Sequence, residues 1–341
     1  MNLPLPAGVD TTGYRLGPPQ RAGALTMVPV FGRAYPGIAP PRSGLKLSRV
    51  VTYGQVELTN PATSGVAIVP LHVGYIQDAA QNHALCRSAF IAAGQTLRFD
   101  DACCVQESQG GYLAERDQWF FILPVELRAA ALRLRGTSQY SKLWGDIAAF
   151  NARHGLPARG HLEQVLTRKR AVLTQYQSRL ELLDGQLGAL FFIGDRLAGV
   201  EIAPDPVYFA EVWMALVCFA YGPAAWFAAP GPDVADPDDT FTAGTLDGVR
   251  AALERRRRRV AEEVGEWLAR AAWRLGSPGG PGSPGGPGPT GEPGSLGELV
   301  EFVEEERYLD LRLSTVTGAA AGGQVVTDGS RLVYASLFAA A

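Results

Sequence analysis

The sequence predicts an α+β fold, in which helices cover a mostly antiparallel sheet within a single large domain. Its 341 residues are 47% hydrophobic and 19% charged, which supplies enough apolar side chains for a large core. Short apolar or alternating segments fill residues 24–123 and return after residue 308. Between them, apolar residues recur mainly at helical spacing. Runs of strands followed by runs of helices are typical of this fold class.

The first half of the chain contains most of the predicted strands. We expect a loosely attached flexible arm over residues 1–23, which are rich in proline and glycine. Because Ala93-Gly94 is a turn signal, the strands on either side of it should form a hairpin. The strands are predicted over residues 24–31, 50–58, 66–75 (despite Pro70), 84–91, 95–99, 102–106 and 119–123.

Helical spacing dominates the middle of the chain. Helices are predicted over residues 125–135, 138–154, 161–183, 207–227 and 246–273, with a strand–turn–strand unit over residues 187–202 that bends at Gly194-Asp195. The helix over residues 207–227 approaches the length of a membrane span. However, Glu211 lies inside it and Gly222-Pro223 interrupts it, so we interpret it as a buried core helix.

A segment rich in glycine and proline, residues 276–299, separates the last helix from the end of the chain. Glycine occupies every third position from Gly276 to Gly297, as in collagen, but we expect a low-complexity linker instead of a triple helix. After it we predict a short acidic helix over residues 299–306 and strands over 308–315 and 324–335. Because an isolated hairpin is marginally stable, these strands should join the first-half sheet. Residues 24–275 and 300–341 then form one domain.

Charge and targeting patterns exclude several classes of partner. The net charge is −3, from 31 basic and 34 acidic residues, so we expect no nucleic-acid partner. The five consecutive arginines Arg255–Arg259 could bind nucleic acid or anionic lipid, but glutamates within four residues favour a salt-bridged, solvated helix face. Residues 1–12 carry neither a positive charge nor a long apolar run, so we expect a cytoplasmic protein without a membrane partner. We also expect neither a metal nor a cofactor, because the sequence has no motif for either.

A dense group of polar residues follows the apolar segment that ends near Tyr75. Amide groups both donate and accept hydrogen bonds, which suits the edge of a nucleobase or ribose hydroxyls. Loops at strand ends commonly carry function, so this group is the candidate ligand site. The alternative is that these side chains cap backbone groups in a turn. The candidate ligand-binding residues are His72, Gln77, Asp78, Gln81, Asn82 and His83.

A candidate catalytic group consists of Cys104, Glu107 and His83. A nucleophilic cysteine needs a base or a positive environment that lowers its pKa, and His83 lies one or two strands away in the predicted sheet. The alternative is that Cys104 is a small buried hydrophobic residue, as free cysteines usually are. We assign these three residues to catalysis only if the protein is an enzyme.

The segment around these groups resembles the ARG and rhodanese-phosphatase-superfamily-associated protein domain, a bacterial family. The matching positions are Gly74, Gln81, Asn82 and Cys104-Val105. A second similar stretch contains the strand pair over residues 190–202, the aromatic helix that starts at Tyr208-Phe209 with Trp213, and the closing residues 328–338. The resemblance implies an association with ADP-ribose and NAD in bacterial conflict systems.

Three positions depart from the family pattern. His83 stands where the pattern has arginine, Gln106 where it has glutamate, and Gln109-Gly110 where it has Arg-Trp. Glutamine neither takes up a proton as a base nor carries charge, which weakens the case for an enzyme.

We therefore expect a non-catalytic binding or adaptor module in a bacterial stress or conflict pathway, with an ADP-ribose-like or NAD-like nucleotide as its ligand. One alternative is a hydrolase acting on a nucleotide or ADP-ribosyl substrate. Another is a structural protein that assembles through protein partners or with itself.

Overall fold

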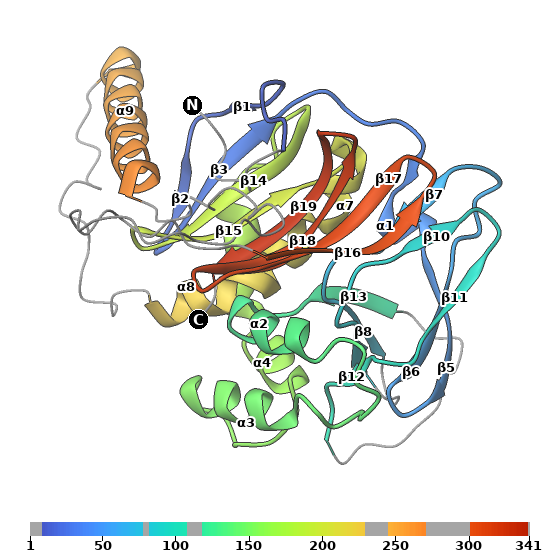
Figure 1. Ribbon diagram of the computed structural model, residues 1–341. Coiled ribbons are helices and arrows are strands. Elements are labelled where there is room, and N and C mark those ends of the chain that lie inside the picture. Colours follow the sequence, from blue (N-terminus) through green and yellow to red (C-terminus); the bar gives the residue numbers. More distant parts are fainter. Residues whose placement is uncertain (1–8, 78–81, 108–117, 229–244, 271–300, 340–341) are drawn as a thin grey trace, which may run out of the picture.

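A nine-stranded antiparallel sheet is the main element of the computed structural model, which describes residues 9–77, 82–107, 118–228, 245–270 and 301–339 (Figure 1). Its strands run in the order β1-β3-β14-β15-β19-β18-β17-β16, and β2 also pairs with β3. They are β1 (Arg15–Leu16), β2 (Gln20–Ala22), β3 (Leu25–Phe31), β14 (Gln186–Ile193), β15 (Arg196–Ile202), β16 (Glu301–Tyr308), β17 (Leu311–Thr317), β18 (Ala321–Asp328) and β19 (Arg331–Ala339).

Three smaller sheets lie beside the large one. One contains β4 (Ile38–Ala39), β7 (Val66–Ile68) and β10 (Phe90–Ala92), and another contains β5 (Lys46–Thr52), β6 (Gln55–Thr59) and β11 (Thr96–Phe99). The third contains β8 (Val73–Gln77), β9 (His83–Ala84), β12 (Cys103–Cys104) and β13 (Gln118–Ile122). This third sheet positions most of the residues that the sequence singles out.

Some helices cover one face of the large sheet, and the others pack mainly against those helices (Figure 1). They are α1 (Pro41–Gly44), α2 (Val125–Arg133), α3 (Trp144–Arg153), α4 (Glu163–Arg168), α5 (Arg170–Leu173), α6 (Gln175–Arg179), α7 (Pro206–Met214), the π-helical turn η1 (Ala215–Tyr221) and α8 (Gly222–Ala228). Asp205 caps α7, because its carboxylate accepts hydrogen bonds from the backbone N–H groups of Val207 and Tyr208.

The continuous helix from Pro206 to Ala228 is a core element. By length and composition alone it could cross a membrane, but 72% of its most apolar window is buried inside the structure. This burial confirms the interpretation of the segment as a core helix.

Side chains alternate between the two faces of the large sheet, as strand geometry requires. Phe191 points toward α7 and η1, whereas its neighbours Leu190 and Phe192 point to the opposite face. There they meet the apolar stripe of α9 (Leu246–Arg270), whose Trp267 ring lies 5.6 Å from that of Phe192. Figure 1 shows α9 standing beside β2 and β3.

The fold class is confirmed, but several strands differ from prediction. Residues 50–58 lie in a hairpin, β5 and β6, whose tip is Tyr53-Gly54. Residues 66–75 divide into β7 and β8, because Pro70 and a turn at Leu71-His72 separate them. The hairpin predicted over residues 84–99 is wrong, since β10 pairs with β7 and β11 pairs with β6.

Other differences concern the chain ends and the helices. Part of the predicted arm is ordered in the sheet as β1 and β2. Residues 161–183 form three short helices, and the helix predicted over residues 299–306 is instead the edge strand β16. The C-terminal strands join the large sheet through β15, whereas the strands over residues 46–122 stay in the smaller sheets. The glycine- and proline-rich linker lies outside the described residues.

Candidate functional site

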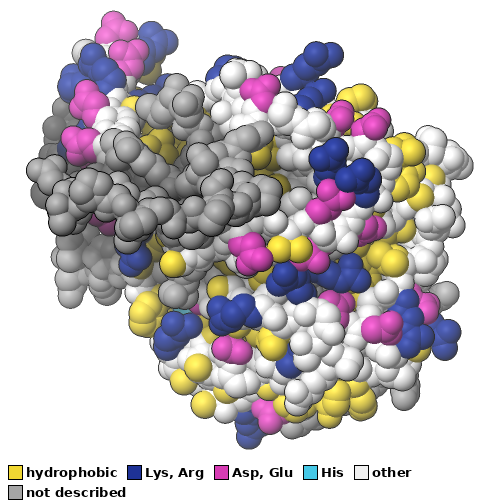
Figure 2. Space-filling model, in the orientation of Figure 1, with side chains coloured by type: hydrophobic (Ala, Val, Ile, Leu, Met, Phe, Trp, Pro, Cys, Tyr) yellow, Lys and Arg dark blue, Asp and Glu magenta, His cyan; other side chains and the backbone are white. Residues whose placement is uncertain are grey.

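Three aromatic side chains form a contiguous surface that we call the aromatic face: Tyr53, Tyr140 and Trp144. The ring centroids of Tyr53 and Tyr140 lie 5.2 Å apart, and those of Tyr140 and Trp144 lie 5.6 Å apart in an edge-on arrangement. Tyr53 is 51% exposed and Tyr140 is 37% exposed, while Trp144 is half-buried. Figure 2 shows hydrophobic side chains gathering at the lower rim of the molecule, in the region of α3 and β12. Exposed rings in contact with one another are a typical feature of binding surfaces.

The aromatic face is held by the strand pair β9–β12, in which Cys104 lies directly opposite His83. The backbone N–H of Gly54, next to Tyr53, donates to His83 Nε2 at 3.2 Å. The backbone of Cys104 holds the other two rings. Its N–H donates to the Tyr140 carbonyl at 2.9 Å, and its carbonyl accepts from Trp144 Nε1 at 2.9 Å. The two strands therefore fix the positions of all three rings.

Gly54 and Glu107 complete this support. Gly54 has a φ of +79°, and a Cβ there would lie 2.9 Å from Cβ of Tyr140, so both the turn and the close approach require glycine. Glu107 Oε2 accepts from the N–H of Gly160 at 2.8 Å, and the Glu107 N–H donates back to the Gly160 carbonyl. Gly160 packs against the Trp144 ring, where a Cβ would lie 2.6 Å from the indole.

The three candidate catalytic residues therefore lie close together, but their hydrogen bonds hold neighbouring backbone segments in place. Burial raises the pKa of the Cys104 thiol, whose Sγ donates to the Gln106 carbonyl. His83 Nε2 accepts a backbone hydrogen bond, so this nitrogen carries no proton and is occupied. A nucleophilic cysteine needs the opposite change in pKa. Among the described residues, no group of three or more His, Cys, Asp or Glu side chains is placed to hold a metal ion.

The candidate ligand-binding residues are not all in one place. Asn82 and His83 are buried beside β12, where the Asn82 carbonyl accepts from the Val105 N–H. Gln77 ends β8 opposite Gln118. Asp78 and Gln81 lie outside the described residues. His72 belongs to a different group of side chains.

That second group is the Arg128 cluster, which consists of Arg128, Glu201, Ser336, Tyr221 and His72. Arg128 is completely buried, and its NH1 donates to Glu201 Oε1 at 2.6 Å. Its Nε donates to His72 Nδ1 at 3.2 Å, and its NH2 donates to the Ser336 hydroxyl. Tyr221 and Ser336 each donate to one oxygen of Glu201 at 2.6 Å. The buried guanidinium and carboxylate are thus paired and hydrogen-bonded, as buried charges must be.

His72 is held in an uncommon conformation at the edge of this cluster. Its φ is +61°, in the left-handed region that few residues other than glycine, asparagine and aspartate adopt. Because Nδ1 accepts from Arg128, the proton of the neutral ring is on Nε2. Burial and the charge of Arg128 hold the pKa of His72 well below its ordinary value of 6.5.

This shift predicts a specific pH dependence of stability. The unfolded chain protonates His72 near pH 6.5, whereas the folded protein does not. The free energy of unfolding should therefore fall by about 1.4 kcal/mol per pH unit as the pH drops below 6.5. Asparagine tolerates the left-handed backbone but does not take up a proton in this pH range. In His72→Asn, the contribution of residue 72 to the pH dependence of the free energy of unfolding should therefore vanish.

Urea unfolding at several pH values between 6.5 and 5 measures both slopes. The other three histidines are present in both proteins, so their contributions cancel in the difference. Equal slopes would show that His72 is protonated in the folded state as readily as in the unfolded chain.

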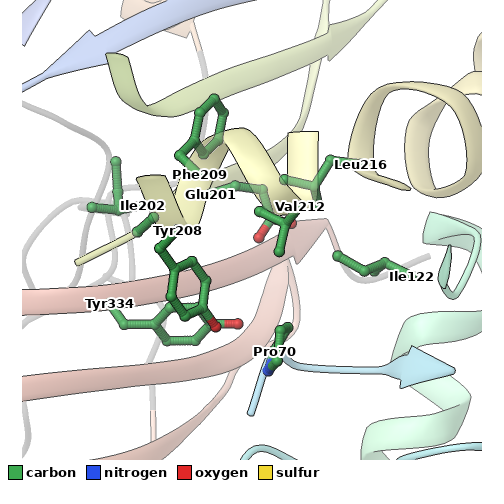
Figure 3. Close-up of a pocket in the computed structure, with 10 residues that line it drawn as sticks. Pro70, Ile122, Glu201, Ile202, Tyr208, Phe209, Val212, Leu216 and Tyr334 are labelled. Carbon is green, nitrogen blue, oxygen red and sulfur yellow. The ribbon is translucent and has the colours of Figure 1, made fainter. Parts of the chain in front are cut away.

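A small cavity adjoins the Arg128 cluster, between α7 and the sheet (Figure 3). Its volume is about 10 Å³, and Glu201, Tyr208 and Tyr334 supply its polar side chains. The hydroxyls of both tyrosines already have partners: Tyr208 donates to the Ile68 carbonyl, and Tyr334 accepts from the Leu71 N–H. Space for at most one water molecule excludes this cavity as a nucleotide site.

A larger hollow of about 370 Å³ opens elsewhere on the surface, between the N-terminal segment and the residues before β14. Arg15 and Asp184 are its charged residues, and the Arg15 guanidinium lies over the Phe31 ring at 4.2 Å. The hollow is large enough for a small ligand, but it contains none of the residues that the sequence singles out.

Sequence reasoning missed both the aromatic face and the Arg128 cluster. Tyr140 and Trp144 are four residues apart, a spacing that brings side chains together on a helical turn. Arg128 shares the spacing of Val125 and Leu132, which marks a core position, and Glu201 interrupts an apolar strand. These signals were available, but only the fold shows that the charged residues meet.

The comparisons with known proteins identify a family. A family model described as the ARG and Rhodanese-Phosphatase-superfamily-associated Protein domain matches residues 13–288. This range covers the aromatic face, as well as Arg128 and Glu201 of the buried cluster. No curated protein and no solved structure matches the chain.

Proposed function

The chain belongs to the ARG and Rhodanese-Phosphatase-superfamily-associated Protein domain family, and we propose that it is a non-catalytic binding module whose ligand surface is the aromatic face. The observation that carries this proposal is the arrangement of Tyr53, Tyr140 and Trp144. Two of these rings are exposed, and the Tyr140 ring contacts both of the others. Backbone and side-chain hydrogen bonds connect the residues that carry the rings, or the residue next to them, to one buried strand pair.

The ligand we propose is an ADP-ribose-like or NAD-like nucleotide, in the setting of a bacterial stress or conflict pathway. An exposed aromatic ring offers a flat face on which a nucleobase stacks. This stacking does not depend on which hydrogen-bonding groups the base carries. A rigid platform loses little conformational entropy on binding, and the backbone anchors make this one rigid.

The two alternatives receive less support from the geometry. A hydrolase based on Cys104 would need a lowered pKa, whereas burial raises it. Self-assembly through the open edge of the large sheet would use β16, which exposes Glu304, Glu305 and Arg307. Charged side chains on an edge strand oppose pairing with a second copy.

Isothermal titration with ADP-ribose and NAD tests the proposal. Stacking on an aromatic side chain contributes about 1–3 kcal/mol per base, so Tyr53→Ala and Tyr140→Ala should each weaken binding by about 5- to 150-fold. Tyr140→Phe keeps the ring and should retain most of the affinity.

The matched control is Phe227→Ala. Phe227 is 61% exposed and lies on α8, so its removal deletes an equally accessible ring from another surface. If this control weakens binding as much as the two tyrosine variants do, or if neither nucleotide binds the folded wild-type protein, the proposal is wrong.

A further inference from the structure

Two other cysteines lie in direct contact at the strand pair β9–β12. Sγ of Cys86 and Sγ of Cys103 are 3.0 Å apart, about 1 Å longer than a covalent S–S bond. Cys86 follows β9, and Cys103 lies in β12, opposite Ala84. Cys86 therefore lies just beyond the strand that pairs with β12, and small rotations would join the two sulfurs.

A lysine ammonium group, held by three backbone carbonyls, lies beside this pair. The Lys142 ammonium donates to the carbonyls of Asp101 at 2.8 Å and Leu134 at 3.0 Å, and also to that of Thr137. This fixes it next to the Cys86 thiol. The hydrogen bond with Cys103 and the Lys142 charge lower the pKa of Cys86, while the hydrogen bond with Cys86 raises the pKa of Cys103. Asp101 is the acidic group that faces the pair, and it also lies 3.4 Å from Arg87.

The other two cysteines lack these features. Cys104 Sγ donates to the Gln106 carbonyl, and burial raises the pKa of its thiol. Burial also raises the pKa of Cys218, to about 11. The chain thus offers one pair of thiols in contact, of which Cys86 is activated, and two unactivated thiols as internal controls.

We propose that Cys86 and Cys103 are a redox-active dithiol, which a small peroxide converts to a disulfide. The Cys86 thiolate attacks one peroxide oxygen, forms a sulfenic acid and releases water after protonation. Cys103 then attacks the Cys86 sulfur, so that the S–S bond forms and a second water leaves. Two thiols and one hydrogen peroxide give one disulfide and two waters. Both sulfurs are buried, which selects for an oxidant as small as hydrogen peroxide.

The disulfide would tie β9 to β12, the strand pair that holds the aromatic rings. The site stands independently of the proposed function, because its chemistry needs no ligand.

Peroxide treatment of the native full-length protein tests this assignment. After catalase quenching, the mass of the intact protein should be 2 Da lower than that of the untreated protein. After denaturation and alkylation with N-ethylmaleimide, mass spectrometry of peptides should find a single cross-link, between Cys86 and Cys103. Cys104 and Cys218 should be fully alkylated. The oxidised protein should melt on the order of 5 °C higher, because the cross-link closes a loop of the unfolded chain.

Variants separate this chemistry from general oxidation. Cys104→Ser and Cys218→Ser should form the cross-link at the wild-type rate, and Cys103→Ser should form none. Lys142→Met should slow it at least several-fold, with Lys142→Arg restoring part of the rate. Four alkylated thiols after treatment, a cross-link to Cys104 or Cys218, or formation only in urea would each overturn the assignment.

Discussion

Replacing Arg128 by methionine is expected to lower the free energy of unfolding by about 3–5 kcal/mol. Arg128 is completely buried, and four side-chain groups accept its hydrogen bonds or pair with it. Its removal leaves the Glu201 carboxylate buried without an opposite charge, which is the costly half of a broken ion pair. Urea or guanidinium unfolding measures the loss.

The matched control is an exposed ion pair of the same types. Arg98 and Asp100 lie 2.7 Å apart, but their side chains are 46% and 61% exposed. Because solvent screens such pairs, Arg98→Ala should cost less than about 1 kcal/mol. In the double variant Arg128→Met with Glu201→Gln, the free energy of unfolding should fall by less than the sum of the decreases in the two single variants. If Arg128→Met is as mild as Arg98→Ala, the cluster does not stabilise the fold.

Gly199→Ala is expected to have the second largest effect on stability. A Cβ at Gly199 would lie 1.9 Å from the hydroxyl oxygen of Tyr221. Tyr221 is buried, stacks on Phe191 at a centroid distance of 4.2 Å and donates to Glu201, so it has no free space into which to move. Overpacking of this kind costs about 1–3 kcal/mol, and displacement of Tyr221 adds the loss of its hydrogen bond.

Gly265→Ala is the control, because it places the same methyl group where no atom lies within 4 Å. It sits inside α9, where alanine is preferred over glycine by about 0.5–1 kcal/mol, so this variant should gain stability. Tyr221→Phe should relieve part of the Gly199→Ala defect, since the hydroxyl is the nearest atom. Equal stability of the two alanine variants would contradict the packing described around Tyr221.

The fold class follows from the sequence because hydrophobic patterning is a local property. Such patterns predict the strands at residues 24–31 and 187–202, with the turn at Gly194-Asp195. They also predict the core helix that starts at Pro206. The pairing of strands depends on distant residues, which is why β10 and β11 pair with β7 and β6 instead of with each other. The charged segment over residues 301–308 looks helical by composition, but as an edge strand it exposes those charges.

At the candidate site, too, the sequence predicts which residues lie near one another but not what they contact. The sequence places His83, Cys104 and Glu107 in one region, and the structure brings them together. Their roles as supports of surface rings depend on backbone hydrogen bonds to residues 54, 140 and 160, which no sequence pattern reports. The Arg128 cluster likewise joins five elements or turns that are far apart along the chain.

Hydrogen exchange with and without ADP-ribose tests the central claim most directly, because it locates the ligand on the chain. If the ligand binds the aromatic face, exchange should slow in peptides that cover residues 50–56, 102–107 and 138–146, with little change around Phe227. The open hollow is the natural competitor, since Arg15, Phe31 and Asp184 line it. Slower exchange at those three positions, with no change at Tyr53 and Tyr140, would contradict the assignment of the aromatic face as the ligand surface.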